Sequence, residues 1–284
     1  MRLVQDVSGR RGHTGRRALC WLALACATLL LTACNGARDD ELPAPRASGP
    51  AIETTEGTAT PYGTGAGQVW VLRPRQGEVK SVVVYLHGYT AYLPFEWHLQ
   101  WMDHLLANGS AVLFPRYQEG LLGDEADDAF VILPLNLEEG LQTGFRALRY
   151  HGEPVVAAGF SVGATLAFVY AARADEWNVP APQAVYSIFP VHPFLIDVGL
   201  DLSTLDHTKA LILAGENDDV VGQDGAKKLM ELLTGEPAGL KELRVIRKTD
   251  AMLADHESPT LVDRPITRET FWKPLDEIVE QARG

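Results

Sequence analysis

The chain has 284 residues, of which 46% are hydrophobic and 22% charged, a balance typical of a globular protein with one large core. Its formal net charge of −12 argues against nucleic acid as a partner and against electrostatic capture by anionic lipid, because both are negatively charged. All three cysteines lie within the first 34 residues. The rest of the chain therefore has no disulfide and no cysteine nucleophile.

The first 33 residues have the pattern of an export signal. Four arginines between positions 10 and 17 precede an apolar run, ALCWLALACATLLLTAC, that is too short to favour a membrane-spanning helix. The run ends in LTAC, residues 31–34, which resembles the lipobox of bacterial lipoproteins. The resemblance implies that residues 1–33 are removed and that acyl chains on Cys34 anchor an exported protein to a membrane of the cell envelope. A plain signal peptide followed by an ordinary thiol is the alternative.

Residues 34–67 are rich in glycine, proline, alanine, threonine and acidic residues, with few side chains that can pack. We expect a flexible tether here, followed by a globular domain over residues 68–284. Because residues 1–33 carry five arginines and one aspartate, their removal would bring the formal net charge to −16. Attachment to a membrane would then depend on acyl chains, at roughly 0.8 kcal/mol per buried methylene.

From residue 68 onward, short apolar segments alternate with helical patterns. The segments are nearly continuous in apolar character, as expected for strands covered on both faces. Strands are predicted at 68–72, 81–86, 111–115, 154–160, 184–189, 210–215 and 242–246, and helices near 95–107, 136–150, 162–174, 222–233 and 270–281. This alternation predicts an α/β fold with a mainly parallel central sheet flanked by helices. Only about twenty residues separate the fifth and sixth of these strands, too few for a large cap domain.

Ser161 lies between Gly159 and Gly163, where a predicted strand meets a predicted helix. A sharp strand-to-helix turn needs glycine at both positions, because a side chain at either would collide with neighbouring backbone. Such a turn exposes the hydroxyl at the carboxyl edge of the sheet, beside a helix N-terminus whose amides favour negative charge. We therefore predict that Ser161 is a nucleophile. The alternative is a serine that caps the helix.

A serine needs a histidine to take its proton and a carboxylate to hold that histidine. From about Gln68 to its end the chain resembles the α/β-hydrolase fold, in which the order is serine, acid, histidine. The acid of that family often stands in G-x-x-D-x-x-V, which matches Asp218, with Asp219 as its competitor. His256 is the one histidine of eight that follows both aspartates. The alternative for the two aspartates is a solvated turn, and the alternative for His256 is a histidine in a surface loop.

The strand predicted at 81–86 runs into HGYTAY, residues 87–92. This resembles the His-Gly turn of esterases, and its GYT portion is similar to that of polyester-degrading cutinases. The resemblance implies that the amides of Tyr89 and Val162 form an oxyanion hole, with the Tyr89 ring beside the acyl group and Tyr92 also at the substrate. His87 is expected to orient the loop. A tight turn with a surface tyrosine is the alternative.

Residues 116–130, RYQEGLLGDEADDAF, are the other segment expected near the site. Their carboxylates lack the paired histidines or cysteines and the loop spacing of a metal site, so a solvated loop is expected. We expect an open or thinly covered cleft, with neither cofactor nor metal.

These features predict a lipid-anchored serine hydrolase of small or lipid-like carboxylic esters, similar to chlorophyllases, cutinases and dienelactone hydrolases. Two alternatives stay open, because the same fold and the same catalytic residues occur in proteins with other functions. One is a binding lipoprotein without turnover, and the other is a peptidase or lactonase with the same three residues.

Overall fold

The computed structural model describes residues 43–91, 93–94, 97–118, 129–234 and 240–284. Residues Ala44–Gly284 form one compact unit. The predicted signal segment, Cys34 and Tyr92 lie outside the described residues. None of the helices in the described ranges has the length and apolar character that a membrane crossing requires.

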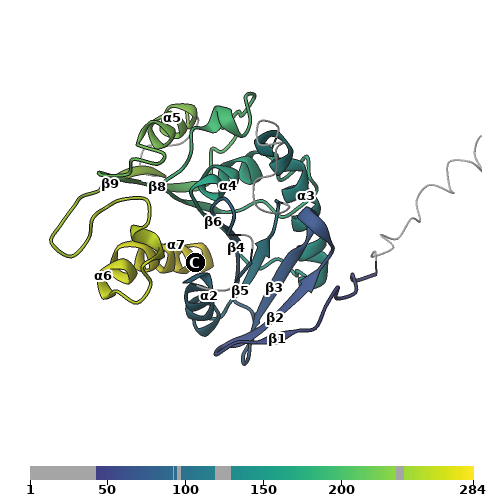
Figure 1. The fold of residues 1–284 in the computed structure, drawn as a ribbon. Coiled ribbons are helices and arrows are strands. Elements are labelled where there is room, and N and C mark those ends of the chain that lie inside the picture. Colours follow the sequence, from purple (N-terminus) through teal and green to yellow (C-terminus); the bar gives the residue numbers. More distant parts are fainter. Residues whose placement is uncertain (1–42, 92, 95–96, 119–128, 235–239) are drawn as a thin grey trace, which may run out of the picture. The chain divides into compact units, whose positions relative to one another are not determined.

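Within the described residues, nine strands form one sheet in the order β1-β2-β3-β5-β4-β6-β7-β8-β9 (Figure 1). The strands are β1 (Ile52–Glu53), β2 (Gly57–Tyr62), β3 (Val69–Pro74), β4 (Ser81–Leu86), β5 (Ser110–Pro115), β6 (Val155–Phe160), β7 (Ala184–Ile188), β8 (Lys209–Gly215) and β9 (Lys241–Ile246). The pairs from β5 through β9 are parallel, and those among β1, β2, β3 and β5 are antiparallel. The predicted fold class is confirmed.

Strands β1 and β2 differ from the flexible tether expected over residues 34–67. β2 pairs with β3 along its whole length, and its residues alternate between buried and partly buried positions. The inward positions are small: Ala59 is fully buried, and a Cβ on Gly57 would lie 2.0 Å from the Arg73 carbonyl oxygen. Small inward residues give a strand little hydrophobic signal, so composition alone indicates a linker. The folded domain begins before Gln68, because Ala47 already bridges to Tyr62.

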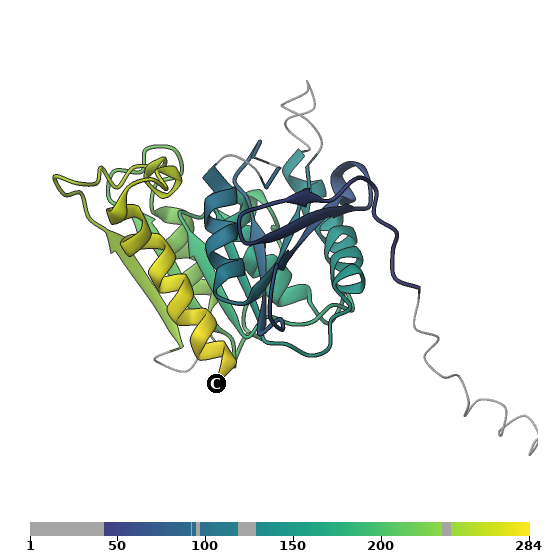
Figure 2. The same ribbon diagram turned by 90° about the horizontal axis from the view of Figure 1, so that it is seen from below.

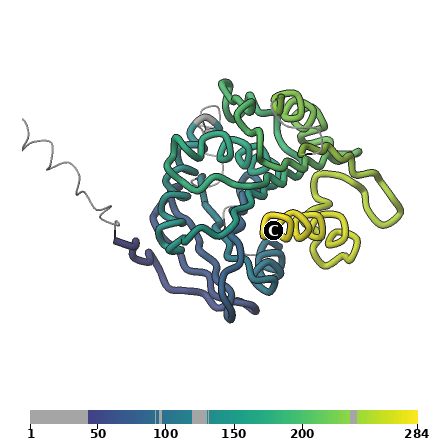
Figure 3. Tube along the Cα trace, turned by 180° about the vertical axis from the view of Figure 1, so that it is seen from behind, coloured from purple at the N-terminus to yellow at the C-terminus, as the bar shows by residue number. Residues whose placement is uncertain are grey.

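The helices cover both faces of the sheet. They are α2 (Trp97–Ala107), α3 (Ala129–Leu148), α4 (Val162–Arg173), α5 (Asp224–Leu232), α6 (Pro265–Thr267) and α7 (Lys273–Arg283), with short turns η1 (Gly65–Gly67), η2 (Pro193–Leu195), η3 (Ser258–Thr260) and the π-helical η4 (Arg268–Trp272). Helices α3, α4 and α5 pack on one face, and α2 and α7 on the other (Figure 2). Figure 3 shows α7 beside α2, where the His104 ring nitrogen Nε2 lies 2.8 Å from Asp276 Oδ2.

The strands supply two separate cores. In β4, for example, Val82 and Val84 face the core under α3 and α4, whereas Val83 and Tyr85 face the core under α2 and α7. This alternation follows from the two-residue period of a strand, and it explains why the parallel strands are apolar at almost every position. Because these strands are parallel, their carboxyl ends share one edge of the sheet. We call this the carboxyl edge, and the opposite one the amino edge.

Candidate active site

Ser161 occupies the turn between β6 and α4, at the carboxyl edge. Its backbone has φ 58° and ψ −120°, a conformation that residues other than glycine rarely adopt. Hydrogen bonds hold the turn in this state: the Ser161 N–H donates to the Ile188 carbonyl at 2.9 Å, and its carbonyl accepts from the Ala164 N–H at 3.1 Å. Ser161 as a whole residue is 7% exposed. The strain is therefore maintained by the fold and directs one hydroxyl toward the edge of the sheet.

The two glycines of this turn are required by contacts with backbone. A Cβ on Gly159 would lie 2.2 Å from the carbonyl oxygen of Gly163, and a Cβ on Gly163 would lie 2.1 Å from that of Leu86. Neither oxygen can move without disturbing β4 or the first turn of α4. The collision expected from the sequence is thus found at both positions.

His256 and Asp218 reach Ser161 from the loops after β9 and β8. The ring nitrogen Nε2 of His256 lies 3.1 Å from Ser161 Oγ, and its Nδ1 lies 2.8 Å from Asp218 Oδ2. Asp219 is exposed, whereas the Asp218 side chain is fully buried and that of His256 is 10% exposed. The three predicted side chains therefore form one continuous chain of contacts, with Asp218 rather than Asp219 beside the imidazole.

The Asp218 carboxylate is held in its charged form. Burial raises its pKa, but hydrogen bonds from His256 and from the N–H groups of Val221 and Val220 outweigh this effect, so the pKa lies below its usual value. The two amides donate to Oδ1 at 3.1 and 3.0 Å, which leaves Oδ2 for the imidazole. A buried carboxylate with this set of donors fixes the proton on Nδ1 and leaves Nε2 free to accept one from serine.

Asn217 joins the acid loop to the histidine loop, a role that sequence analysis missed. Its side-chain Nδ2 donates to the Leu253 carbonyl at 2.8 Å, and its N–H donates to the Ala254 carbonyl at 3.1 Å. Ala254 has φ 57°, so the histidine loop is also strained. An asparagine between two acidic residues carries no signal of such a contact in the sequence.

The turn after β4 lies against the serine. A Cβ on Gly88 would lie 3.6 Å from that of Ser161, and Tyr89 is the residue that follows Gly88. Val162 is the first residue of α4, and its N–H has no carbonyl partner within the helix. The oxyanion hole expected from the amides of Tyr89 and Val162 stays a prediction.

A buried cluster fixes the turn after β4. The ring nitrogens of His87 lie 2.6 Å from the Gly88 carbonyl oxygen and 2.8 Å from that of Arg116, and burial lowers the pKa of His87 to about 4. The ring stacks on Tyr117, with centroids 4.1 Å apart, and the Tyr117 hydroxyl donates to the His87 carbonyl. These contacts agree with the expectation that His87 orients the loop.

Gln118 is a second residue that sequence analysis missed. It is buried, and its Oε1 accepts the N–H of Thr90 at 3.0 Å. Thr90 has φ 70°, so this bond holds a strained residue next to Tyr89. The Tyr89 ring itself is partly buried and lies 5.3 Å from that of Phe130, at the start of α3. The sequence signal that could have identified Gln118 is its polar side chain within the expected flap, residues 116–130.

Acidic residues 124, 125, 127 and 128 of the expected flap lie outside the described residues. In the described ranges, no three histidine, cysteine, aspartate or glutamate side chains are placed to hold a metal ion.

No protein-family model matches the sequence, and no curated protein sequence matches it. Several solved structures resemble the fold. A cold-adapted esterase from an Arctic intertidal metagenomic library is 15% identical, with a TM-score of 0.60 over 83% of this chain and 98% of that one. An esterase of Pyrococcus furiosus is 17% identical, with a TM-score of 0.53 over 83% and 91%. An esterase/lipase from an uncultured bacterium is 15% identical, with a TM-score of 0.55 over 82% and 87%. The chain therefore has the α/β-hydrolase fold, with a mainly parallel sheet of nine strands in the part that the structure describes.

Proposed function

We propose that this protein is a serine hydrolase that cleaves carboxylic esters through an acyl-enzyme. The observation that carries the proposal is the pair of contacts from His256, at 3.1 Å to Ser161 Oγ and at 2.8 Å to Asp218 Oδ2. Each contact has the length of a hydrogen bond, and together they let one imidazole take a proton from serine while a carboxylate stabilises the resulting cation.

In the first half of the reaction, Ser161 Oγ attacks the ester carbonyl and its proton moves to His256 Nε2. The carbonyl oxygen becomes negatively charged, and the amides of Tyr89 and Val162 donate to it. When the tetrahedral intermediate collapses, the bond to the alcohol breaks and Nε2 returns the proton to the leaving oxygen. The products of this half are a free alcohol and an acyl group on Ser161.

In the second half, a water molecule gives a proton to His256 Nε2 and attacks the acyl carbonyl. Collapse of the second intermediate releases the carboxylic acid and returns the proton to Ser161 Oγ. These steps use only side chains, backbone amides and water. Esters are preferred as the substrate class because the solved structures with this fold include several described as esterases.

Labelling by a fluorophosphonate tests this function. Such a reagent phosphonylates an activated serine, so we expect wild-type protein to be labelled and to hydrolyse p-nitrophenyl esters. Ser161→Ala should be folded, unlabelled and slower by about 10⁶ in turnover. Well-folded wild-type protein that takes no label would favour a binding protein instead. Ester turnover that survives in Ser161→Ala would overturn the mechanism.

We propose further that Cys34 carries acyl chains and holds the protein at a membrane of the cell envelope. The support is the LTAC tetrapeptide at the end of the apolar run. Incorporation of labelled palmitate into the wild type, and its loss in Cys34→Ser, is the expected result. Equal incorporation by the two proteins would contradict an anchor at this position.

A further inference from the structure

The peptide unit that carries the Tyr89 N–H is held on its carbonyl side. That carbonyl belongs to Gly88, and its oxygen lies 2.6 Å from Nδ1 of His87 and accepts the Ala91 N–H at 3.2 Å. A peptide unit is planar and almost always trans, so its N–H points away from its carbonyl oxygen. The contacts of the Gly88 oxygen therefore fix the direction of the Tyr89 N–H from one side.

The next peptide unit along the chain carries the Thr90 N–H, which donates to Oε1 of Gln118 at 3.0 Å. Thr90 has φ 70°, a value that β-branched residues rarely adopt because the side chain crowds the backbone. Strain of this kind persists only where the surroundings hold it. Its release would rotate the peptide unit that joins Thr90 to Tyr89. The Gln118 oxygen therefore opposes a rotation that would carry the Tyr89 N–H out of place.

Gln118 is itself held in place through its backbone. Its N–H donates to the Arg116 carbonyl at 2.6 Å, and Nε of Arg116 donates to the Gln118 carbonyl at 3.2 Å. Tyr117, between them, donates its hydroxyl to the His87 carbonyl and accepts Nδ2 of Asn136 at its own carbonyl. Because this segment is tied both to the turn after β4 and to α3, the Gln118 oxygen has a fixed position beside the turn.

The Gln118 amide contributes little net stability to the fold. Its Nε2 is buried and has no hydrogen-bond partner in the part of the chain that the structure describes. A buried donor without a partner costs at least as much free energy as one hydrogen bond contributes. The bond from Thr90 is therefore offset by the unpaired Nε2. The amide thus matters more for the place of the turn than for the free energy of unfolding.

We propose that Gln118 is a positioning residue of the oxyanion hole. Its Oε1 holds the Thr90 N–H, so that the neighbouring Tyr89 N–H is directed at the oxygen of the reacting ester before the reaction begins. The effect on catalysis rests on the function proposed above, whereas the hold on the turn rests on the contacts alone. Loss of a whole oxyanion donor costs about 10² to 10³ in turnover, which sets an upper limit for a residue that only directs one.

Gln118→Met tests the proposal, because methionine keeps the length of the side chain without its polar atoms. We expect kcat for a p-nitrophenyl ester to fall by about 10- to 100-fold, with KM within about threefold of the wild type, because the amide is needed most when the oxygen is charged. The midpoint of thermal unfolding should move by less than about 3 °C. A kcat within twofold of the wild type would overturn the proposal, and a large fall in the midpoint would assign Gln118 to folding instead.

Gln142→Met is the matched control. Gln142 lies on α3 and is partly buried, and its Nε2 donates to the Trp177 carbonyl at 2.9 Å. The same substitution there removes a side-chain amide that makes no contact with the turn after β4, so kcat should stay unchanged. Equal losses of kcat in the two variants would show that the effect is not specific to the turn, and would overturn the role of Gln118.

Thr90→Gly tests whether Gln118 acts through the strained residue. Glycine adopts φ 70° without steric cost, so the turn then needs less support. In the Thr90→Gly background, Gln118→Met should lower kcat by less than about threefold, as a double-mutant cycle measures. An equal loss in both backgrounds would mean that the Gln118 oxygen acts elsewhere, against the proposal.

Residue-resolved hydrogen exchange tests the hold on the turn without any ester. We expect the Thr90 amide to exchange at least about tenfold faster in Gln118→Met than in the wild type, with no change in Gln142→Met. Unchanged exchange would contradict the hold on the turn. Faster exchange with unchanged kcat would overturn the role in catalysis. Faster exchange in Gln118→Met, when the wild type hydrolyses no ester, would overturn the proposed function and leave the hold in place.

Discussion

The two edges of the sheet differ in how much strained backbone they hold. At the carboxyl edge the backbone is strained: of the seven non-glycine residues with positive φ in the described ranges, five follow strand ends there, at Thr90, Tyr117, Ser161, Phe189 and Ala254. The other two, Arg149 and Asn178, follow α3 and α4 and precede β6 and β7, toward the amino edge. Polar groups at that edge are paired. The guanidinium of Arg283, near the end of α7, donates to the hydroxyls of Ser81 and Ser110 and to the Asn108 carbonyl.

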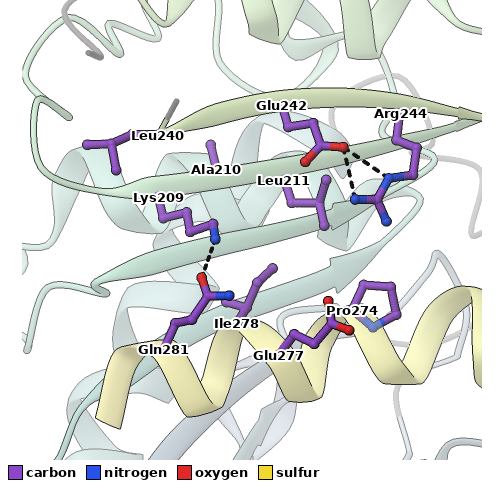
Figure 4. A pocket seen from close by; sticks show the side chains of 10 residues that line it. All are labelled: Lys209, Ala210, Leu211, Leu240, Glu242, Arg244, Pro274, Glu277, Ile278 and Gln281. Atoms are coloured by element: carbon purple, nitrogen blue, oxygen red, sulfur yellow. Dashed lines mark hydrogen bonds and ion pairs between the residues drawn. The ribbon is translucent and has the colours of Figure 1, made fainter. Parts of the chain in front are cut away.

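A cavity at the amino edge is also lined by polar groups that contact one another. It has a volume of about 150 Å³ and lies between β8, β9 and α7 (Figure 4). Among its charged groups, Arg244 pairs with Glu242 at 2.9 Å, and the Lys209 ammonium donates to the Gln281 side chain. Most of the strained residues, and the buried hydroxyl of Ser161, thus lie at the edge where chemistry is proposed.

After Ser161→Ala, the largest expected effect at the carboxyl edge comes from Asp218→Asn. An amide cannot hold the His256 proton on Nδ1 as the carboxylate does, so turnover should fall by about 10⁴ with little change in fold. Ester hydrolysis measures the turnover, and thermal unfolding measures whether the fold is kept. Asp219→Asn is the matched control, because Asp219 is exposed and should change turnover less than tenfold. The reverse ranking of these variants would assign the acid to Asp219.

The next largest effect is expected on stability, from a substitution in the strained turn that holds Ser161. In Gly163→Ala the new methyl would lie 2.1 Å from the Leu86 carbonyl oxygen, so β4 or α4 must shift. We expect a loss of about 4 kcal/mol in the free energy of unfolding, measured by urea denaturation. Gly199→Ala, whose methyl meets only an Asp197 carboxylate oxygen at 3.6 Å, should change stability by less than about 1 kcal/mol. Similar values for the two would show that the turn tolerates a side chain.

The carboxyl edge was also the part that the sequence predicted well. Ser161, Asp218 and His256 each follow a predicted strand, and parallel strands bring their ends to one edge, so order along the chain implied proximity in space. Asn217 and Gln118 were not found, because their contacts are with backbone carbonyls and amides of distant loops. Such contacts depend on loop conformation, which composition and periodicity do not encode.

The antiparallel end of the sheet was predicted less well. Hydrophobic pattern identifies strands that are covered on both faces, and every such strand was found. β2 has alanine and threonine in the middle of the strand, so its sequence carries little hydrophobic signal. Its strand structure comes from pairing with β3 along its whole length. α3 begins at Ala129, seven residues before the predicted start near 136, with Pro134 inside it. Pro134 lies in the second turn of α3, and a proline there weakens the helical pattern of the sequence.

His87 should give a pH-dependent effect of intermediate size. Its pKa is about 4 in the folded protein, because burial disfavours the charged ring, against 6.5 as its ordinary value. The unfolded state thus binds more protons between these values, and stability present above pH 6.5 is lost as the pH falls toward 4, by about 3 kcal/mol. We expect His87→Asn to be less stable than the wild type at pH 8, because the variant lacks the ring that stacks on Tyr117. The difference in stability between the two proteins should be smaller at pH 4 by about 3 kcal/mol, because only the wild type loses stability as His87 titrates. A deficit that stays constant with pH in chemical denaturation would contradict the buried neutral ring.

The smallest expected effect lies at the amino edge. Arg283→Gln removes the donors to Ser81, Ser110 and the Asn108 carbonyl, and the Arg283 side chain is 13% exposed. We expect a loss of about 1 to 2 kcal/mol in the free energy of unfolding, with turnover per folded molecule unchanged. Arg247→Gln is the matched control, because that side chain is 72% exposed and its pair with Glu216 should contribute less than about 0.5 kcal/mol. A drop in turnover of the folded Arg283→Gln protein would mean that the two edges are coupled, since no substrate contact is proposed at the amino edge.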